Sequence, residues 1–223
     1  MILGHYAVAF GAKYYAPLAS LGTLIFAALL LDLLCAVFLL LDWERVRIVP
    51  GLMSASALDC EHFPISQSLL SSLVLGGILG GGYLVFRRYP RGAGVLAAVV
   101  ISHWLLDLPM HRPDLPLWPG SDIKLGVGLW NSVAATLVIE LLLLTAGVVL
   151  YTRVTNPRDN RGTRALLAMV GFLVIIFIGT LFGPPPSNQD ALALASMTLW
   201  LTVPWGYWTD RQREPSRLLG PFN

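Results

Sequence analysis

The stretch PLASLGTLIFAALLLDLLCAVFLLL, residues 17–41, decides the fold class. A bilayer core about 30 Å thick needs roughly 20 apolar residues of helix, because each residue of an α-helix rises about 1.5 Å. This stretch reaches that length and contains one charged residue, Asp32. It is typical of a transmembrane helix and predicts an integral membrane protein.

The whole chain has the composition of such a protein. Of its 223 residues, 56% are hydrophobic and 13% are charged, whereas a soluble domain has about 25% charged residues. The net charge of +2 and the lack of a basic stripe with interleaved aromatic residues argue against a nucleic-acid partner. We therefore expect one integral membrane domain over residues 1–223, with membrane lipid as its main partner.

Further apolar stretches predict an all-α fold with six transmembrane helices. Prolines at 90, 157 and 184–186 separate several of them, because proline lacks an amide hydrogen and clashes with the preceding helical turn. Residues 2–16 are apolar but short, and predict an additional N-terminal helix that is either re-entrant or spanning. The six predicted spans are residues 17–41, 65–86, 92–108, 125–151, 164–182 and 191–208.

Lysine and arginine are divided unequally between the two predicted sides of the membrane. Eleven of the 15 fall on one side, namely Lys13, Arg87, Arg88, Arg91, Arg153, Arg158, Arg161, Arg164, Arg211, Arg213 and Arg217. The other side has Arg45, Arg47, Arg112 and Lys124. Because loops rich in Lys and Arg stay in the cytoplasm, we place the C-terminus there and the long loops 42–64 and 109–124 outside.

Polar residues that can perform chemistry gather in residues 1–124, which we distinguish as the polar-site half from a helical membrane half, residues 125–223. All four histidines lie in the first half: His5, His62, His103 and His111. Ionisable residues inside a span are costly, and each is a candidate for function. A lone carboxylate such as Asp32 is expected to be protonated there, or paired with a cation or metal.

The sharpest local signal is Ile101-Ser102-His103-Trp104-Leu105-Leu106-Asp107. His103 and Asp107 are four residues apart, so they share one face of a helix. An imidazole and a carboxylate that converge in this way suit a zinc or manganese site, or a His–Asp proton relay. The same spacing also occurs in hydrogen-bonded pairs that stabilise a helix end, and spacing alone leaves both interpretations open.

A proline-rich loop follows directly, over residues 108–120. Its four prolines exclude a regular helix. A rigid loop bearing His111, Arg112 and Asp114 would cover a site near Asp107, and Arg112 would hold an anionic group because guanidinium matches carboxylate and phosphate geometry. Alternatively, the loop is interfacial and its Trp118 is anchored at the headgroups.

The predicted span 125–151 contains two further polar residues, Asn131 and Glu140, which lie nearly on one helical face. Glu140 is expected deep in the membrane, where its carboxyl group needs a partner. The residues leave open whether that partner is a neighbouring helix, through a structural hydrogen bond, or a substrate in a catalytic role.

These elements occur in an order that resembles the YdjM-like family of membrane-bound, metal-dependent hydrolases of bacteria and archaea. The resemblance covers about the first 120 residues, through Gly4-His5, Asp32, the Ser-Leu-Leu element at 68–70, residues 102–107 and the stretch ending in Leu117-Trp118-Pro119. It implies a bacterial inner-membrane protein. It also implies a metal site formed by His5, Asp32, His103, Asp107 and the histidine of a Thr- or Ser-His-Ser-Leu motif.

This chain departs from the family at that last motif. It has Gln67 where the family has histidine, and an amide is a poor ligand for zinc, which favours thiolate, imidazole and carboxylate. A glutamine carbonyl suits harder ions such as calcium or magnesium. His62 lies five residues earlier and offers a replacement only if the loop takes a different path.

Two main hypotheses follow. In the first, the protein is a metal-dependent hydrolase at the extracytoplasmic boundary, with zinc or manganese activating water and a phosphoester or lipid-linked substrate. His62 and His111 would transfer protons, and Gln67, Arg112 and Asp114 would contact the substrate. In the second, the protein is an inactive family member that serves as an accessory subunit of a membrane-protein complex. A proton-coupled transporter using Asp32 and Glu140 is a third, weaker alternative.

Overall fold

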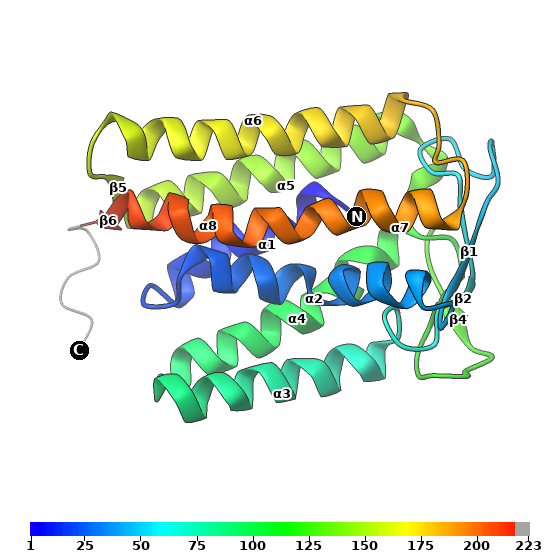
Figure 1. The fold of residues 1–223 in the computed structure, drawn as a ribbon, viewed down its shortest axis with the longest axis horizontal. Helices are drawn as coiled ribbons and strands as arrows, with labels where there is room; N and C mark the ends of the chain where they lie inside the picture. The colour runs from blue at the N-terminus through cyan, green and yellow to red at the C-terminus, as the bar shows by residue number, and fades with distance from the viewer. Residues whose placement is uncertain (217–223) are drawn as a thin grey trace.

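A computed structural model describes residues 1–216, which form a bundle of helices running roughly side by side (Figure 1). Among these residues, five helices are long and apolar enough to cross a membrane. They are α2 (Leu21–Leu40), α3 (Leu69–Arg87), α4 (Pro90–Met110), α5 (Val133–Val154) and α6 (Asn160–Phe182). The all-α prediction is thereby confirmed. Of the residues used to predict orientation, Arg217 lies outside the described part.

Short strands join the helices at the two ends of the bundle (Figure 1). At one end, β1 (Arg45–Ile48) pairs antiparallel with β2 (Leu58–His62), and β3 (Leu115–Pro116) pairs with β4 (Lys124–Leu125). At the other end, β5 (Thr155–Pro157) pairs with β6 (Arg213–Pro215). The loops 42–64 and 109–124 therefore lie at the same end, and the β1–β2 hairpin within the first of them was not predicted.

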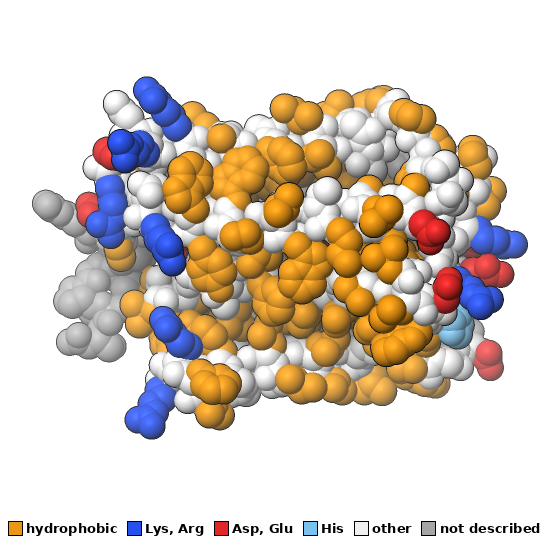
Figure 2. Space-filling view, in the orientation of Figure 1, with side chains coloured by type: hydrophobic (Ala, Val, Ile, Leu, Met, Phe, Trp, Pro, Cys, Tyr) orange, Lys and Arg blue, Asp and Glu red, His pale blue; other side chains and the backbone are white. Residues whose placement is uncertain are grey.

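Charged side chains mark the same two ends. Figure 2 shows most of the visible Lys and Arg side chains at the end of β5 and β6, and most of the visible Asp and Glu side chains at the opposite end. Hydrophobic side chains cover the broad face between them. This distribution is that of a membrane protein with a wide apolar band. The assignment of the Lys- and Arg-rich end to the cytoplasm stays a prediction.

Polar side chains fix where the long helices begin. Ser20, Ser68, Ser132 and Asp159 each accept a hydrogen bond from a backbone N–H of the first turn of α2, α3, α5 and α6, which is the usual role of these residue types at a helix start. The cap at Ser132 corrects the predicted start of the fourth span at residue 125. Residues 125–131 instead contribute to β4 and to a 3₁₀ turn, Leu129–Asn131. Asn131 is therefore exposed and precedes the membrane helix.

The sixth predicted span is divided. Its residues form α7 (Gln189–Met197), a 3₁₀ turn (Thr198–Leu201) and α8 (Thr202–Arg211), which follow one another as a nearly continuous rod (Figure 1). Pro204 explains the interruption, because it has no N–H to donate to the carbonyl of residue 200 and its ring crowds the preceding turn. The prediction of six uninterrupted spans was wrong at this point.

The N-terminal helix α1 (Leu3–Tyr15) is too short to be among the five candidate spans, and its re-entrant placement stays a prediction. Its 13 residues extend about 20 Å, less than the bilayer core. Its last turn lies at the end of β5 and β6, where Lys13 bonds to Asp210 of α8 at 2.7 Å, and its first turn is buried inside the bundle (Figure 1). α1 packs against α2, α4 and α5. Its start therefore brings polar groups into the interior of the bundle.

Candidate metal centre

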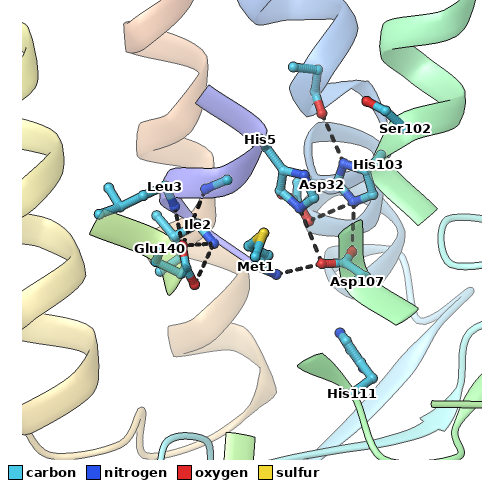
Figure 3. Close-up of polar contacts among 12 residues, drawn as sticks. Met1, Ile2, Leu3, His5, Asp32, Ser102, His103, Asp107, His111 and Glu140 are labelled. Carbon is cyan, nitrogen blue, oxygen red and sulfur yellow. Dashed lines mark hydrogen bonds and ion pairs between the residues drawn. The ribbon is translucent and has the colours of Figure 1, made fainter. Parts of the chain in front are cut away.

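Three helices bring four of the predicted ligands together inside the bundle (Figure 3). His5 comes from the first turn of α1, Asp32 from α2, and His103 and Asp107 from consecutive turns of α4. We call these four residues the membrane cluster. One ligand atom from each of His5, His103 and Asp107 lies within 4.8 Å of the others, so α1 supplies a donor that joins the pair on α4.

The distances within the membrane cluster centre on Asp107. Its Oδ1 lies 3.3 Å from His5 Nε2, and its Oδ2 lies 3.2 Å from His103 Nε2. The two imidazole rings stack face to face, with centroids 3.8 Å apart and planes inclined by 5°. Asp32 Oδ1 lies 3.6 Å from His103 Nε2. Two imidazoles and two carboxylates therefore face one small volume.

The tautomer of His103 is fixed by its surroundings. His103 Nδ1 lies 2.9 Å from the carbonyl oxygen of Ala28, and a carbonyl only accepts, so Nδ1 carries the proton. In a neutral ring, Nε2 then presents its lone pair toward the cluster. Histidines that bind metals commonly donate their other N–H to a backbone carbonyl in this way.

Three of the four ring nitrogens in the membrane cluster make no well-aligned hydrogen bond, although both Nε2 atoms lie close to Asp107. His103 Nε2 and both ring nitrogens of His5 are buried and have no hydrogen bond of suitable geometry within residues 1–216. Buried polar atoms without partners are rare and call for an explanation. A cation held between the two Nε2 atoms and Asp107 would satisfy both Nε2 atoms. The donor set also matches zinc, and manganese less specifically.

The start of α1 is held in place by two carboxylates. Glu140 of α5 accepts hydrogen bonds from the backbone N–H groups of Ile2, Leu3 and Gly4, at distances of 3.0, 2.5 and 3.3 Å to Oε2. These groups form the positive end of the helix dipole, so the helix start supplies the partner that a buried Glu140 needs. The amino group of Met1 donates to Asp107 Oδ1 at 2.6 Å.

Exposure differs sharply within the membrane cluster. The side chains of His5, His103 and Asp107 are 1–2% exposed, whereas that of Asp32 is 29% exposed. Asp32 is therefore the member of the cluster that reaches the surface of the bundle.

Several residues expected near this site lie elsewhere. His62 is exposed on β2, and Gln67 is buried ahead of α3 with no hydrogen-bond partner for its Oε1 among residues 1–216. Arg112 bonds to Asp59 of β2. The β1–β2 hairpin, which the sequence did not predict, carries His62 and the Asp59 partner of Arg112.

A second group forms beneath the β1–β2 hairpin. His111 Nδ1 lies 3.0 Å from Asp114 Oδ1, and one ligand atom from each of Cys60, His111 and Asp114 lies within 4.8 Å of the others. We call these three residues the hairpin cluster. Burial raises the pKa of the Cys60 thiol well above its ordinary value, and Asp114 adds to the rise. Cys60 was not a predicted site residue, and no spacing in the sequence connects it with His111.

The chain gave no match in comparisons with protein-family models, with curated proteins or with solved structures. Its function is therefore inferred from the geometry of the two clusters and from the sequence motifs described above.

Proposed function

We propose that the protein is a membrane-embedded, metal-dependent hydrolase of the YdjM-like type, with its metal held by the membrane cluster. The observation that supports this most is the convergence of His5, His103 and Asp107 from two helices, with both Nε2 atoms buried beside the Asp107 carboxylate and without a well-aligned hydrogen bond among residues 1–216. A purely structural network would be expected to satisfy these atoms. When bound, zinc or manganese would supply a Lewis acid that activates water and polarises the scissile group.

The residues around the metal have separate roles in this proposal. His103 is held in one tautomer by Ala28, so its Nε2 is oriented before any ligand arrives. Glu140 positions His5, because it fixes the first turn of α1 through three backbone N–H groups. Asp32 is the exposed member, and it is placed to accept a proton from the attacking water.

A substrate at the membrane boundary fits the location. Asp107 lies within the last turn of α4, which ends at Met110, and the loops 42–64 and 109–124 follow at this end of the bundle (Figure 1). A lipid-linked ester or phosphoester could present its polar headgroup there while its chains stay in the bilayer. Arg112 does not face the membrane cluster, since it pairs with Asp59, so the proposal gives it no role in holding the headgroup.

Metal analysis of the full-length protein in detergent tests the proposal. After reloading with zinc or manganese, Asp107→Asn should contain about one equivalent less metal than the wild type, because the central carboxylate ligand is lost. Asp122→Asn is the matched control, since Asp122 is exposed in the loop before β4. The two variants and the wild type are then compared on phosphoester and lipid-ester substrates.

Equal metal content in Asp107→Asn and wild type would remove the membrane cluster as a metal site. Asp107→Asn also deprives the Met1 amino group of its partner, so folding is checked by size-exclusion chromatography. His103→Gln provides a second variant that keeps Asp107. Loss of metal in both, with normal elution, is the expected result.

An accessory, non-catalytic role is the second candidate, and the contact of the Met1 amino group with Asp107 favours it. In that arrangement the ammonium group takes the place of a cation next to the carboxylate. This role requires that wild type and Asp107→Asn bind equally little metal after reloading. It also requires a membrane-protein partner that co-purifies with the chain.

A further inference from the structure

The hairpin cluster joins two segments that are far apart in the sequence. Cys60 lies on β2, and His111 and Asp114 lie in the loop that follows α4. All three are buried, with exposures of 8%, 6% and 5%. The three ligand atoms that lie within 4.8 Å of one another come from a thiol, an imidazole and a carboxylate, which are the three donor types that zinc prefers.

One atom of this cluster is left unsatisfied. Asp114 Oδ2 is buried and has no hydrogen-bond partner within residues 1–216, although Arg112 Nε approaches it to 3.5 Å. The same guanidinium group donates a hydrogen bond to Asp59 through Nη2, and its ion pair with Asp114 is the longer of the two contacts. A buried carboxylate oxygen without a hydrogen bond is costly, and a cation shared with Cys60 and His111 would satisfy it.

The neighbouring contacts hold the two segments in place. Asp59 precedes Cys60, Arg112 follows His111, and the pair Asp59–Arg112 links β2 to the loop. The His111 ring also packs on Trp130, with centroids 4.3 Å apart. Together with the contact between His111 and Asp114, these interactions hold the three donors close to one another, which is the preorganisation that a metal site needs.

There is room for a fourth ligand. A cavity of about 70 Å³ is lined by Asp114, Glu61 and His62, among other residues, and so reaches the cluster at Asp114. A water molecule needs about 10–15 Å³ by the same kind of measure. A water molecule in this cavity would be the fourth ligand beside three protein ligands, as in zinc sites that retain a water molecule.

We propose that Cys60, His111 and Asp114 bind one zinc ion, separate from the membrane cluster, which fastens the β1–β2 hairpin to the loop after α4. Binding exchanges the thiol proton of Cys60 for the metal and releases it to solvent. The thiolate and the carboxylate together balance the two charges of the ion, so no net charge is buried. This site does not depend on the proposed hydrolase activity.

Cobalt substitution tests the proposal directly. The reduced, full-length protein in detergent is stripped of metal and titrated with Co²⁺, and a thiolate-to-cobalt charge-transfer band in the near ultraviolet is the expected result. Cys60→Ser should lose this band. Cys35→Ser is the matched control and should keep it, because Cys35 and Cys60 are the two cysteines of the chain.

Further variants separate this proposal from the hydrolase proposal. His103→Gln should keep the band while it loses metal from the membrane cluster, and Asp114→Asn should weaken Co²⁺ binding at the thiolate about 10-fold or more. Size-exclusion chromatography and helical circular dichroism show whether each variant is folded. The absence of a band in the wild type, or its persistence in a folded Cys60→Ser protein, would overturn the proposal.

Discussion

The membrane cluster and the hairpin cluster contain similar donors but rest on different supports. His5, His103 and Asp107 lie on α1 and α4, two helices that pack into the main hydrophobic core. The backbone hydrogen bonds of each helix are made within that helix. Cys60 lies on a two-stranded sheet, and His111 and Asp114 lie on an irregular loop. A two-stranded sheet is marginally stable by itself. Metal removal is therefore expected to loosen the hairpin cluster and to leave the helices around the membrane cluster in place.

The two clusters also differ in how their positions are coupled to the rest of the molecule. The membrane cluster depends on where α1 lies against α5, because α1 brings His5. The hairpin cluster depends on the Asp59–Arg112 pair. A substitution that disturbs the α1–α5 packing should therefore lower metal binding at the membrane cluster alone. A substitution that disturbs the Asp59–Arg112 pair should lower metal binding at the hairpin cluster alone.

The largest effect is expected at Gly147 of α5. A Cβ atom there would lie 2.3 Å from the carbonyl oxygen of Ala7 in α1, so Gly147→Ala must displace α1. Overpacking of this kind costs about 1–3 kcal/mol. We expect a lower thermal unfolding temperature and loss of metal from the membrane cluster, with the cobalt–thiolate band unchanged.

The control for this prediction is Gly171→Ala in α6. Its added Cβ meets no atom within 4 Å, so it changes helix propensity without changing packing. If Gly171→Ala and Gly147→Ala had the same metal content and the same unfolding temperature, the position of α1 would not control the membrane cluster.

The sequence predicted the supports of the membrane cluster better than those of the hairpin cluster. A polar residue inside an apolar span is conspicuous, as Asp32 and Glu140 are, and the spacing of His103 and Asp107 follows from helix geometry. His5 was implied by the family resemblance alone, since spacing cannot show that α1 turns back into the bundle. The sequence did not indicate Cys60 as a site residue, because polar residues are common in loops. Cys60 meets His111 and Asp114 only through the fold of the β1–β2 hairpin.

Helix boundaries show the same limit. Hydropathy placed α2, α3, α4 and α6 within a few residues, because length and apolar content decide whether a helix spans. It extended the fourth span back to residue 125, where apolar residues form β4 instead, and it missed the break near Pro204. Both errors arise where local backbone chemistry, a serine cap or a proline, overrides the average hydropathy.

A smaller effect is expected at Glu140. Glu140→Gln keeps the shape of the side chain but removes the negative charge that faces the start of α1. Loss of a helix N-terminal partner costs about 1 kcal/mol. We expect a modest fall in the unfolding temperature and weaker zinc binding at the membrane cluster, measured by competition with a chelator. Unchanged zinc affinity would mean that His5 is positioned by apolar packing rather than by Glu140.

The smallest effect on stability is expected at Arg112, whose side chain is 36% exposed. Arg112→Lys keeps the charge but loses the planar guanidinium that contacts Asp59 and Asp114 through different nitrogens, and such a partly exposed pair contributes about 0–1 kcal/mol. The unfolding temperature should therefore barely change. Co²⁺ affinity at Cys60 should still fall several-fold, because the two segments that carry the donors are less well aligned, whereas metal content at the membrane cluster should stay the same. The backbone N–H of His111 donates to the carbonyl oxygen of Asp107 at 2.9 Å, which connects the two clusters directly. An equal loss of metal affinity at both clusters would show that this connection couples them and that the two clusters act as one site.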